Sequence, residues 1–376
     1  MKKTLKFLKR LMIVFLSIIA LLVLVVFLYM QQPKFGKAPN GERLERIKQS
    51  PQYHDGSFKN TSFTPTLTKG YSMLGLLYEQ FFKLHPNKTP NGNIPNTKTN
   101  LHELSPDETV LVWFGHSSYF IQIEGLKFLI DPVFSGNASP IPGSVKAFKG
   151  ADTYTVNDLP KIDYLLITHD HYDHLDYPTI TQLKNKVAHV ICGLGVGSHL
   201  EYWGYKPENI TENDWHDTVK IKNNIKLHTT PARHFSGRTF KRNNTLWLSY
   251  VLETPNLKLF LGGDSGYDTH FKAIGDKHGP FDLAILENGQ YNLAWEAIHT
   301  LPEQVLKAAT DLKTKRLFPV HSAKFALAMH PWDEPLNEVY RLNKLYNFPL
   351  VTPIIGEKLN LNDTTQQFKA WWKAVD

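Results

Sequence analysis

The sequence contains one cysteine in 376 residues, which excludes any intramolecular disulfide. Cys192 ends the apolar run 187–192, and this setting is typical of a buried strand thiol rather than of a nucleophile. An oxidising compartment is therefore neither required nor excluded. Internal repeats and low-complexity segments are absent as well. From residue 108 onward the pattern of short apolar runs is typical of one large domain.

Excess charge of either sign is also absent once the first ten residues are set aside. Those ten residues hold five of the 42 basic residues and no acidic residue, so residues 11–376 carry 37 basic and 35 acidic residues, a net charge of +2. This balance speaks against a nucleic-acid partner, because such proteins present a basic patch or stripe.

One long apolar segment interrupts this balance. Residues 11–30 contain no charged side chain, and a helix of that length at about 1.5 Å per residue spans a bilayer core of about 30 Å. The segment is not followed by the A-x-A pattern of a cleavage site, so we predict an uncleaved anchor rather than a signal peptide. The dense basic flank at 1–10 predicts a cytoplasmic N-terminus, with the rest of the chain outside, in the periplasm or the extracellular space.

Residues 31–107 are rich in Pro, Asn, Lys and Thr and show little periodicity. We expect short helices at 43–47 and at 74–84, the second with an apolar face. The aromatic residues in this stretch argue against a disordered linker, which is the alternative, and favour a juxtamembrane spacer and extension that packs on the main domain.

Residues 108–376 form the predicted catalytic domain. Short apolar runs first follow one another and then alternate with helical patterns at 303–312 and 336–346, which predicts packed sheets with helices outside. The expected strands are 109–114, 119–123, 127–130, 164–168, 189–192, 225–230, 246–253, 257–261, 281–286 and 316–320.

Residues 168–176 are the most informative segment. They follow the apolar run 164–167 and place His169, His171, Asp173 and His174 in an H-x-H-x-D-H pattern. Imidazole and carboxylate groups are the ligands that Zn²⁺ takes outside thiolate sites, although Fe or Mn also accepts them. Four such groups within six residues cannot all reach one tetrahedral ion without strain, so the pattern predicts two ions with a hydroxide held between them.

Three later residues complete this predicted site. His234, Asp264 and His321 each follow an apolar run, where ligands at strand ends belong. We expect His169, His171 and His234 at one ion. Asp173, His174 and His321 would bind the other, and Asp264 would bridge both.

These segments resemble the metallo-β-lactamase superfamily. The run HDHYDH at 169–174 matches its signature, and WFGHSS at 113–118, FLIDPVF at 128–134, PARH at 231–234, GGDSGY at 262–267 and VHSAKFAL at 320–327 resemble the branch of N-acyl-phosphatidylethanolamine-hydrolysing phospholipase D. The resemblance covers about residues 108–335 and implies a four-layer αβ/βα sandwich with a dinuclear zinc site at one edge. All seven ligand positions carry the expected residue types.

Three further residues have weaker assignments. The resemblance implies that Asp131 is a partner of a ligand histidine and that His299 lies near the substrate, where it could protonate a leaving group. His116, after Gly115 in a tight turn, could face the cleft. Each could instead be an ordinary turn or helix-entry residue.

Together these features predict a membrane-anchored, zinc-dependent hydrolase of phospholipase D type acting on an N-acyl-phosphatidylethanolamine-like lipid. Asp173 would hold a metal and orient the hydroxide. One alternative is a lactonase or other carboxylic-ester hydrolase acting on a small ester, because the same hydroxide attacks a carbonyl. Another is a non-catalytic metal-binding scaffold, which the complete ligand set argues against.

Overall fold

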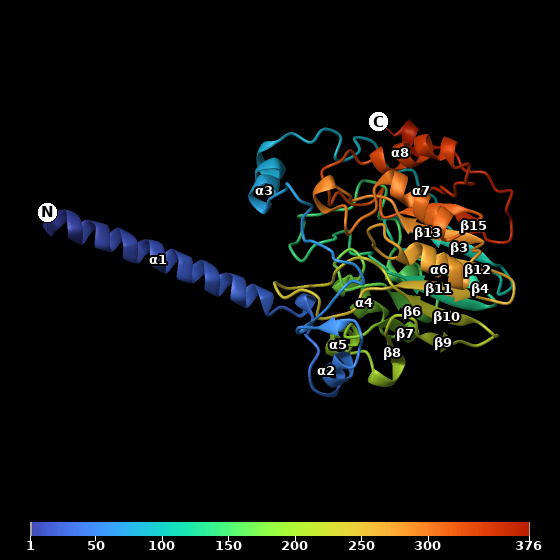
Figure 1. The fold of residues 1–376 in the computed structure, drawn as a ribbon, viewed down its shortest axis with the longest axis horizontal. Coiled ribbons are helices and arrows are strands. Elements are labelled where there is room, and N and C mark those ends of the chain that lie inside the picture. The colour runs from blue at the N-terminus through green and yellow to red at the C-terminus, as the bar shows by residue number, and fades with distance from the viewer. Residues whose placement is uncertain (1, 376) are drawn as a thin grey trace.

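Two β-sheets form the centre of the fold in the computed structural model, which describes residues 2–375 (Figure 1). The strand order is β15-β3-β4-β5-β6-β7-β8 in the seven-stranded sheet and β14-β13-β12-β11-β10-β9 in the six-stranded sheet. The first sheet contains β3 (Val110–Trp113), β4 (Tyr119–Ile123), β5 (Leu126–Ile130), β6 (Ile162–Ile167), β7 (Val187–Gly193), β8 (Ile210–Asn213) and β15 (Lys358–Asn360). The second contains β9 (Thr218–Lys220), β10 (Lys226–Thr230), β11 (Ser249–Glu253), β12 (Lys258–Leu261), β13 (Leu283–Glu287) and β14 (Leu317–Val320).

Burial on both faces explains why these strands read as apolar runs. In β6, Leu166 points into the core between the sheets, whereas Leu165 and Ile167 point to the outer face, as the two-residue period of a strand requires. Leu252 and Leu259 of the second sheet belong to the same inner core. The two sheets therefore pack face to face.

Helices cover the outer face of each sheet. Ile180 and Leu200 belong to the apolar layer on the first sheet, and Leu306 and Val339 to the layer on the second. The result is the expected four-layer αβ/βα sandwich, which is thus confirmed. The covering helices are α4 (Tyr177–Leu183) and α5 (Gly197–Tyr202) on one side and α6 (His270–His278), α7 (Pro302–Asp311) and α8 (Glu334–Leu342) on the other.

The N-terminal helix α1 (Lys2–Met30) projects away from the sandwich (Figure 1). It is long and apolar enough to cross a membrane, and none of its described side chains is buried. Helix formation extends through the basic flank as well as through the apolar run. The Tyr29 hydroxyl donates a hydrogen bond to the carbonyl of Pro140 at 2.8 Å, so the last turn of α1 contacts the domain.

The segment after α1 lies partly in the core and partly on the surface. Phe58 and Ile94 are fully buried with the residues between the sheets, and α2 (Gly41–Lys48) buries Ile47 there. In contrast, α3 (Met73–Phe82) has no buried residue. The expected apolar residues of this helix are therefore present, but none of them is buried against the domain. A short hairpin, β1 (Tyr53–His54) with β2 (Ser57–Phe58), precedes it.

Candidate metal centre

The side chains of the site come from loops at one edge of the two sheets. Strands β5 to β8 run parallel, as do β12 to β14, so their carboxyl ends meet at the same edge. The 168–176 loop follows β6, and His234, Asp264 and His321 follow β10, β12 and β14. The topology therefore brings together residues that are about 150 positions apart in the sequence.

The first group contains His169, His171, His234 and Asp264, whose ligand atoms all lie within 4.8 Å of one another. Nδ1 of His171 lies 2.9 Å from Nε2 of His169 and 3.2 Å from Nε2 of His234. Oδ2 of Asp264 lies 3.8 Å from Nε2 of both His169 and His234. Three imidazoles that converge on one point with a carboxylate beside them form a donor set that suits Zn²⁺.

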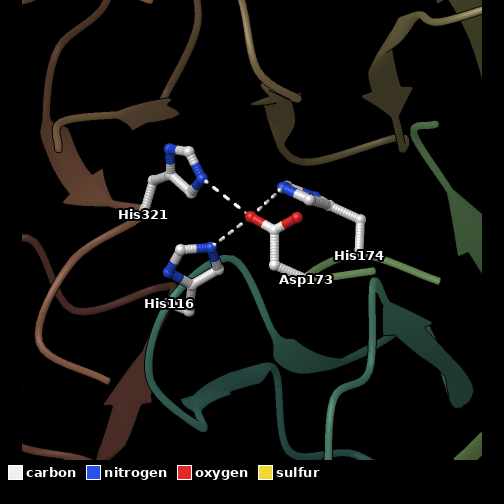
Figure 2. A group of neighbouring side chains, drawn as sticks. All are labelled: His116, Asp173, His174 and His321. Carbon is white, nitrogen blue, oxygen red and sulfur yellow. Dashed lines mark hydrogen bonds and ion pairs between the residues drawn. The ribbon is translucent and has the colours of Figure 1, made fainter. Parts of the chain in front are cut away.

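The second group contains His116, Asp173, His174 and His321, also within 4.8 Å (Figure 2). Oδ2 of Asp173 lies 2.9 Å from Nε2 of His116, 3.3 Å from that of His321 and 3.5 Å from that of His174. The sequence left open whether His116 faces the cleft or is an ordinary turn residue. Its side chain is fully buried inside this group.

Asp264 contacts both groups. Its Oδ1 lies 3.2 Å from Nε2 of His174, and its Oδ2 lies 3.3 Å from Nε2 of His321, in addition to its approach to the first group. This is the position that a bridging carboxylate requires. His234, Asp264 and His321 thus lie together with residues of the 169–174 cluster.

The hydrogen bonding of the donor atoms also fits bound metal ions. Nε2 of His174 and Oδ1 of Asp264 are buried but have no hydrogen-bond partner among the described residues. Buried polar atoms in proteins are almost always paired, and an unpaired one often marks an ion that completes the site. These two ligand atoms face each other at 3.2 Å without a hydrogen bond at the junction of the groups, which is what a dinuclear site would present.

Electrostatics divides the histidines into two kinds. Burial holds the pKa of His171 at about 4 and lowers the pKa of His169 and His234 well below the usual value, so these rings stay neutral and keep a lone pair for a cation. Burial acts on His321 in the same direction, but Asp264 and Asp173 outweigh it and raise its pKa to about 9. The pKa of His174 is raised for the same reason.

The two carboxylates show the reciprocal effect. Burial alone would raise the pKa of Asp264, but the positive charge of His174 and His321 holds it well below the usual value. The pKa of Asp173 is lowered in the same way, mainly by His174 and His116. The second group is therefore a charged cluster in which protons supply the positive charge that divalent ions would bring.

A surrounding layer of carboxylates orients these rings. Oδ2 of Asp131 lies 2.8 Å from Nδ1 of His174 and accepts a 2.6 Å hydrogen bond from the Thr168 hydroxyl. Glu287 was not anticipated. Its Oε2 lies 2.7 Å from Nδ1 of His299 and 3.3 Å from Nδ1 of His321. Glu287 ends β13, so the strand-end criterion that found Asp264 could also have found it.

Three site residues hold strained backbone conformations. His116, Asp131 and His321 have φ of 54°, 41° and 65°, in the left-handed region that non-glycine residues seldom adopt. Such strain costs about 1–3 kcal/mol per residue and persists where function demands it. The three positions place side chains around the second group.

A cavity of about 390 Å³ opens over both groups. Asp173, Asp264, His299 and His321 line it, and so does Arg242, whose guanidinium lies 4.8 Å from the ring centroid of Phe235. His299 thus lies at the predicted cleft, with its ring centroid 5.0 Å from that of His234. The rest of the lining is mostly apolar. It includes Leu67, Met73, Leu76, Leu77, Phe235, Trp295, Ile298, Leu327 and Met329, together with the polar residues Thr66, Gln80, His171 and Gln290.

Comparison with known proteins agrees with this geometry. Residues 127–322, just over half of the chain, match the model of the beta-lactamase superfamily domain. The chain belongs to the metallo-β-lactamase superfamily. It is a metal-dependent hydrolase of that fold, and its buried His/Asp clusters are consistent with a binuclear metal centre.

The chain is similar to two curated proteins over most of its length and to one solved structure. An uncharacterised protein of Mycobacterium tuberculosis is 35% identical over 330 residues, which cover 87% of this chain and 88% of the relative. N-acyl-phosphatidylethanolamine-hydrolyzing phospholipase D 1 of Caenorhabditis elegans is 28% identical over 341 residues, covering 82% and 91%. The expected likeness to that branch is therefore confirmed as distant homology.

The third similar protein is a solved structure. A metallo hydrolase of the archaeon Ignicoccus hospitalis superposes with a TM-score of 0.52 at 19% identity, over 67% of this chain and 97% of that one. At this identity the likeness shows the fold alone.

Proposed function

We propose that this protein is a membrane-anchored, dinuclear zinc phosphodiesterase that cleaves an N-acyl-phosphatidylethanolamine-like lipid. The observation that carries the proposal is the Asp264 carboxylate, which touches both His/Asp groups at the floor of a mainly apolar cavity. A bridging carboxylate beneath an open cavity is typical of two-metal hydrolases.

The proposed ligands follow from the two groups. His169, His171 and His234 would hold one ion, Asp173, His174 and His321 the other, and Asp264 both. When bound, the two ions would supply a hydroxide near neutral pH and would stabilise negative charge on the phosphoryl oxygens. His116 supports the second group through Asp173, to which it is 2.9 Å distant.

His299 is the proposed proton donor to the leaving alkoxide. Glu287 accepts the hydrogen bond of its Nδ1, which leaves Nε2 as the nitrogen that can exchange a proton in the cavity. Cleavage of the P–O bond on the alcohol side releases an alkoxide, which must be protonated. A histidine at the cavity wall, held by a carboxylate, is suited to that step.

The cavity wall supports a lipid phosphodiester as substrate. Its apolar side chains match acyl or glyceryl carbon, and Arg242 is the one Lys or Arg side chain that lines it among the described residues. Arg242 forms no ion pair with a described carboxylate, so its charge is available to an anionic substrate. A neutral lactone would not use that charge. The homology to the worm phospholipase D points the same way.

The N-terminal helix would keep the enzyme at its substrate. We propose that α1 is an uncleaved anchor with residues 1–10 in the cytoplasm, a spacer and extension at 31–107, and the hydrolase domain at 108–376 outside. No cleavage pattern follows the apolar run, and the five basic residues before it favour retention of that end inside.

Replacement of the bridging carboxylate tests the proposal. Asp264→Ala should lose both ions in elemental analysis and lose hydrolysis of N-acyl-phosphatidylethanolamine and of bis-p-nitrophenyl phosphate. Asp268→Asn, on the same loop but ion-paired with Arg233, is the matched control and should retain both. Full activity of Asp264→Ala would refute the mechanism. Turnover of lactones but of no phosphodiester would favour an ester hydrolase, and iron or manganese in the purified protein would correct the metal.

A further inference from the structure

Helix α3 presents two apolar faces. Met73, Leu76 and Leu77 recur at helical spacing and line the cavity over the metal centre. The opposite face carries Leu74, Tyr78, Phe81 and Phe82, spaced by four, three and one residues. Their side chains are 80%, 61%, 74% and 76% exposed. We call these four residues the outer face of α3.

Local interactions form this helix without help from a core. The Ser72 hydroxyl accepts a hydrogen bond from the amide of Gly75 at 3.1 Å, which is a standard N-terminal cap. A helix in water that buries nothing on its outer face normally places polar residues there. A continuous stripe of two phenylalanines, a leucine and a tyrosine instead marks a surface that binds an apolar partner.

The arrangement of α1 identifies that partner. Figure 1 shows α3 on the side of the domain from which α1 projects, level with the last turns of α1 along the long axis. If α1 crosses a bilayer, the membrane surface meets this side of the domain. The outer face of α3 then lies at the depth of the lipid headgroups and upper acyl chains.

We propose that α3 is an interfacial helix that inserts its outer face into the bilayer beside the mouth of the cavity. An interfacial helix lies in the plane of the membrane with its apolar side chains about 5–10 Å into the headgroup and acyl boundary. The opposite face of the same helix forms cavity wall. A lipid could therefore pass along α3 from the bilayer to the metal centre without crossing water.

Spin-label accessibility in the full-length protein tests the docking directly. Leu74, Phe81, Phe82 and Leu345 are each replaced by Cys, labelled, and the protein is reconstituted in phosphatidylcholine vesicles. Cys192 is fully buried and will not be labelled. Leu345, 80% exposed but outside α3, is the matched control.

Labels on α3 should collide often with oxygen and rarely with a polar nickel chelate, whereas the Leu345→Cys label should show the reverse. Aqueous accessibility of all the α3 labels would overturn the proposal. Protection from both reagents would also overturn it, because it would show that the outer face is covered by a second copy of the chain rather than by lipid. These outcomes do not depend on any catalytic activity.

The route to the metal centre rests on the proposed function and needs a second measurement. The triple variant Leu74→Ser, Phe81→Ser, Phe82→Ser should lower turnover of lipid in vesicles by roughly tenfold, since three apolar contacts with the bilayer are lost. Turnover of soluble bis-p-nitrophenyl phosphate should not change, because none of the three residues lines the cavity. An equal fall for both substrates, or for neither, would refute the route. If the wild type cleaves neither substrate, the proposed function fails while the accessibility result still decides the docking.

Discussion

At the scale of single residues, the site combines neutral and charged histidines around one carboxylate. Burial keeps His169 and His234 neutral, whereas Asp264 and Asp173 keep His174 and His321 protonated. Ions that enter the second group must therefore displace protons, and those entering the first need not. The asymmetry means that the two ions would bind with different sensitivity to acid.

Glu287 is predicted to act through His299. Glu287→Gln replaces the carboxylate that accepts the Nδ1 hydrogen bond and orients the ring, so hydrolysis of a lipid with an alkoxide leaving group should fall by about 10²-fold. p-Nitrophenolate leaves without a proton, so bis-p-nitrophenyl phosphate should be cleaved at nearly the wild-type rate. Rate measurements on both substrates, with His299→Gln as the companion variant, check this.

An equal loss on both substrates, accompanied by loss of metal, would contradict this role. It would show that Glu287 matters through its 3.3 Å approach to His321. Elemental analysis of the purified variant therefore accompanies the rate measurements.

His270 is predicted to make stability depend on pH. Burial holds its pKa at about 4, and its Nε2 lies 3.1 Å from the Ser265 hydroxyl. The unfolded chain, with a value near 6.5, binds more protons between pH 6.5 and 4, so stability is complete above pH 6.5 and falls as the pH drops toward 4. Acidification from pH 7 to 4 should cost the metal-free wild type at most about 3 kcal/mol more than His270→Gln. Urea unfolding of both at several pH values measures the difference, and identical pH profiles would contradict it.

The sequence predicted more of the site than of its surroundings. The criterion of a His or Asp directly after an apolar run located His234, Asp264 and His321, because strand ends of parallel sheets share an edge. It did not identify His116 as a member of the second group, since the left-handed turn that points this ring inward depends on backbone geometry rather than on composition. Glu287 was missed because acidic residues at strand ends are common.

At the scale of elements, long apolar runs were predicted well and short polar strands were not. The ten expected strands all occur, with ends shifted by up to three residues. The runs ITEN, TVK and KLN of β8, β9 and β15 were not anticipated. They lie at the edges of the sheets and bury few apolar residues, so the hydrophobic pattern that identifies a strand is weak there.

The buried side chain of Arg238 connects the segments around the 168–176 loop. The Arg238 guanidinium donates hydrogen bonds to the carbonyls of Lys34, Asp170 and Leu175 at 2.7–2.8 Å and stacks 4.1 Å above the ring of Tyr172. Arg238→Met leaves three carbonyls, two of them buried, without this partner and should cost about 3–5 kcal/mol of folding stability.

Urea unfolding in detergent micelles measures this loss. Arg341→Met, on the exposed face of α8, removes an ion pair with Glu338 and should cost less than about 0.5 kcal/mol. Equal stability of the two variants would show that the hydrogen bonds of Arg238 do not stabilise the segments around the 168–176 loop.

At the scale of the whole molecule, charge is distributed unevenly along the chain. Five basic residues precede the apolar run, and residues 11–376 are nearly neutral. A helix long and apolar enough to cross a membrane was predictable from length and composition alone. The position of α3 on the side of the domain from which α1 projects (Figure 1) was not, because the relation between two surface helices depends on how the whole domain folds.

This uneven charge predicts the orientation of the protein. Moving a positive charge against the membrane potential costs about 2.3 kcal/mol per 100 mV, so we predict that the five basic residues would hold the first turns of α1 in the cytoplasm. A membrane-impermeant maleimide should label Leu345→Cys in intact bacterial cells and Thr4→Cys only after lysis, while buried Cys192 stays unlabelled. Replacing the five basic residues with Gln should mix the two patterns, because the apolar run would still insert but its direction would no longer be fixed. Labelling of Thr4→Cys alone in intact cells would place the hydrolase domain in the cytoplasm and restrict its substrates to the inner leaflet.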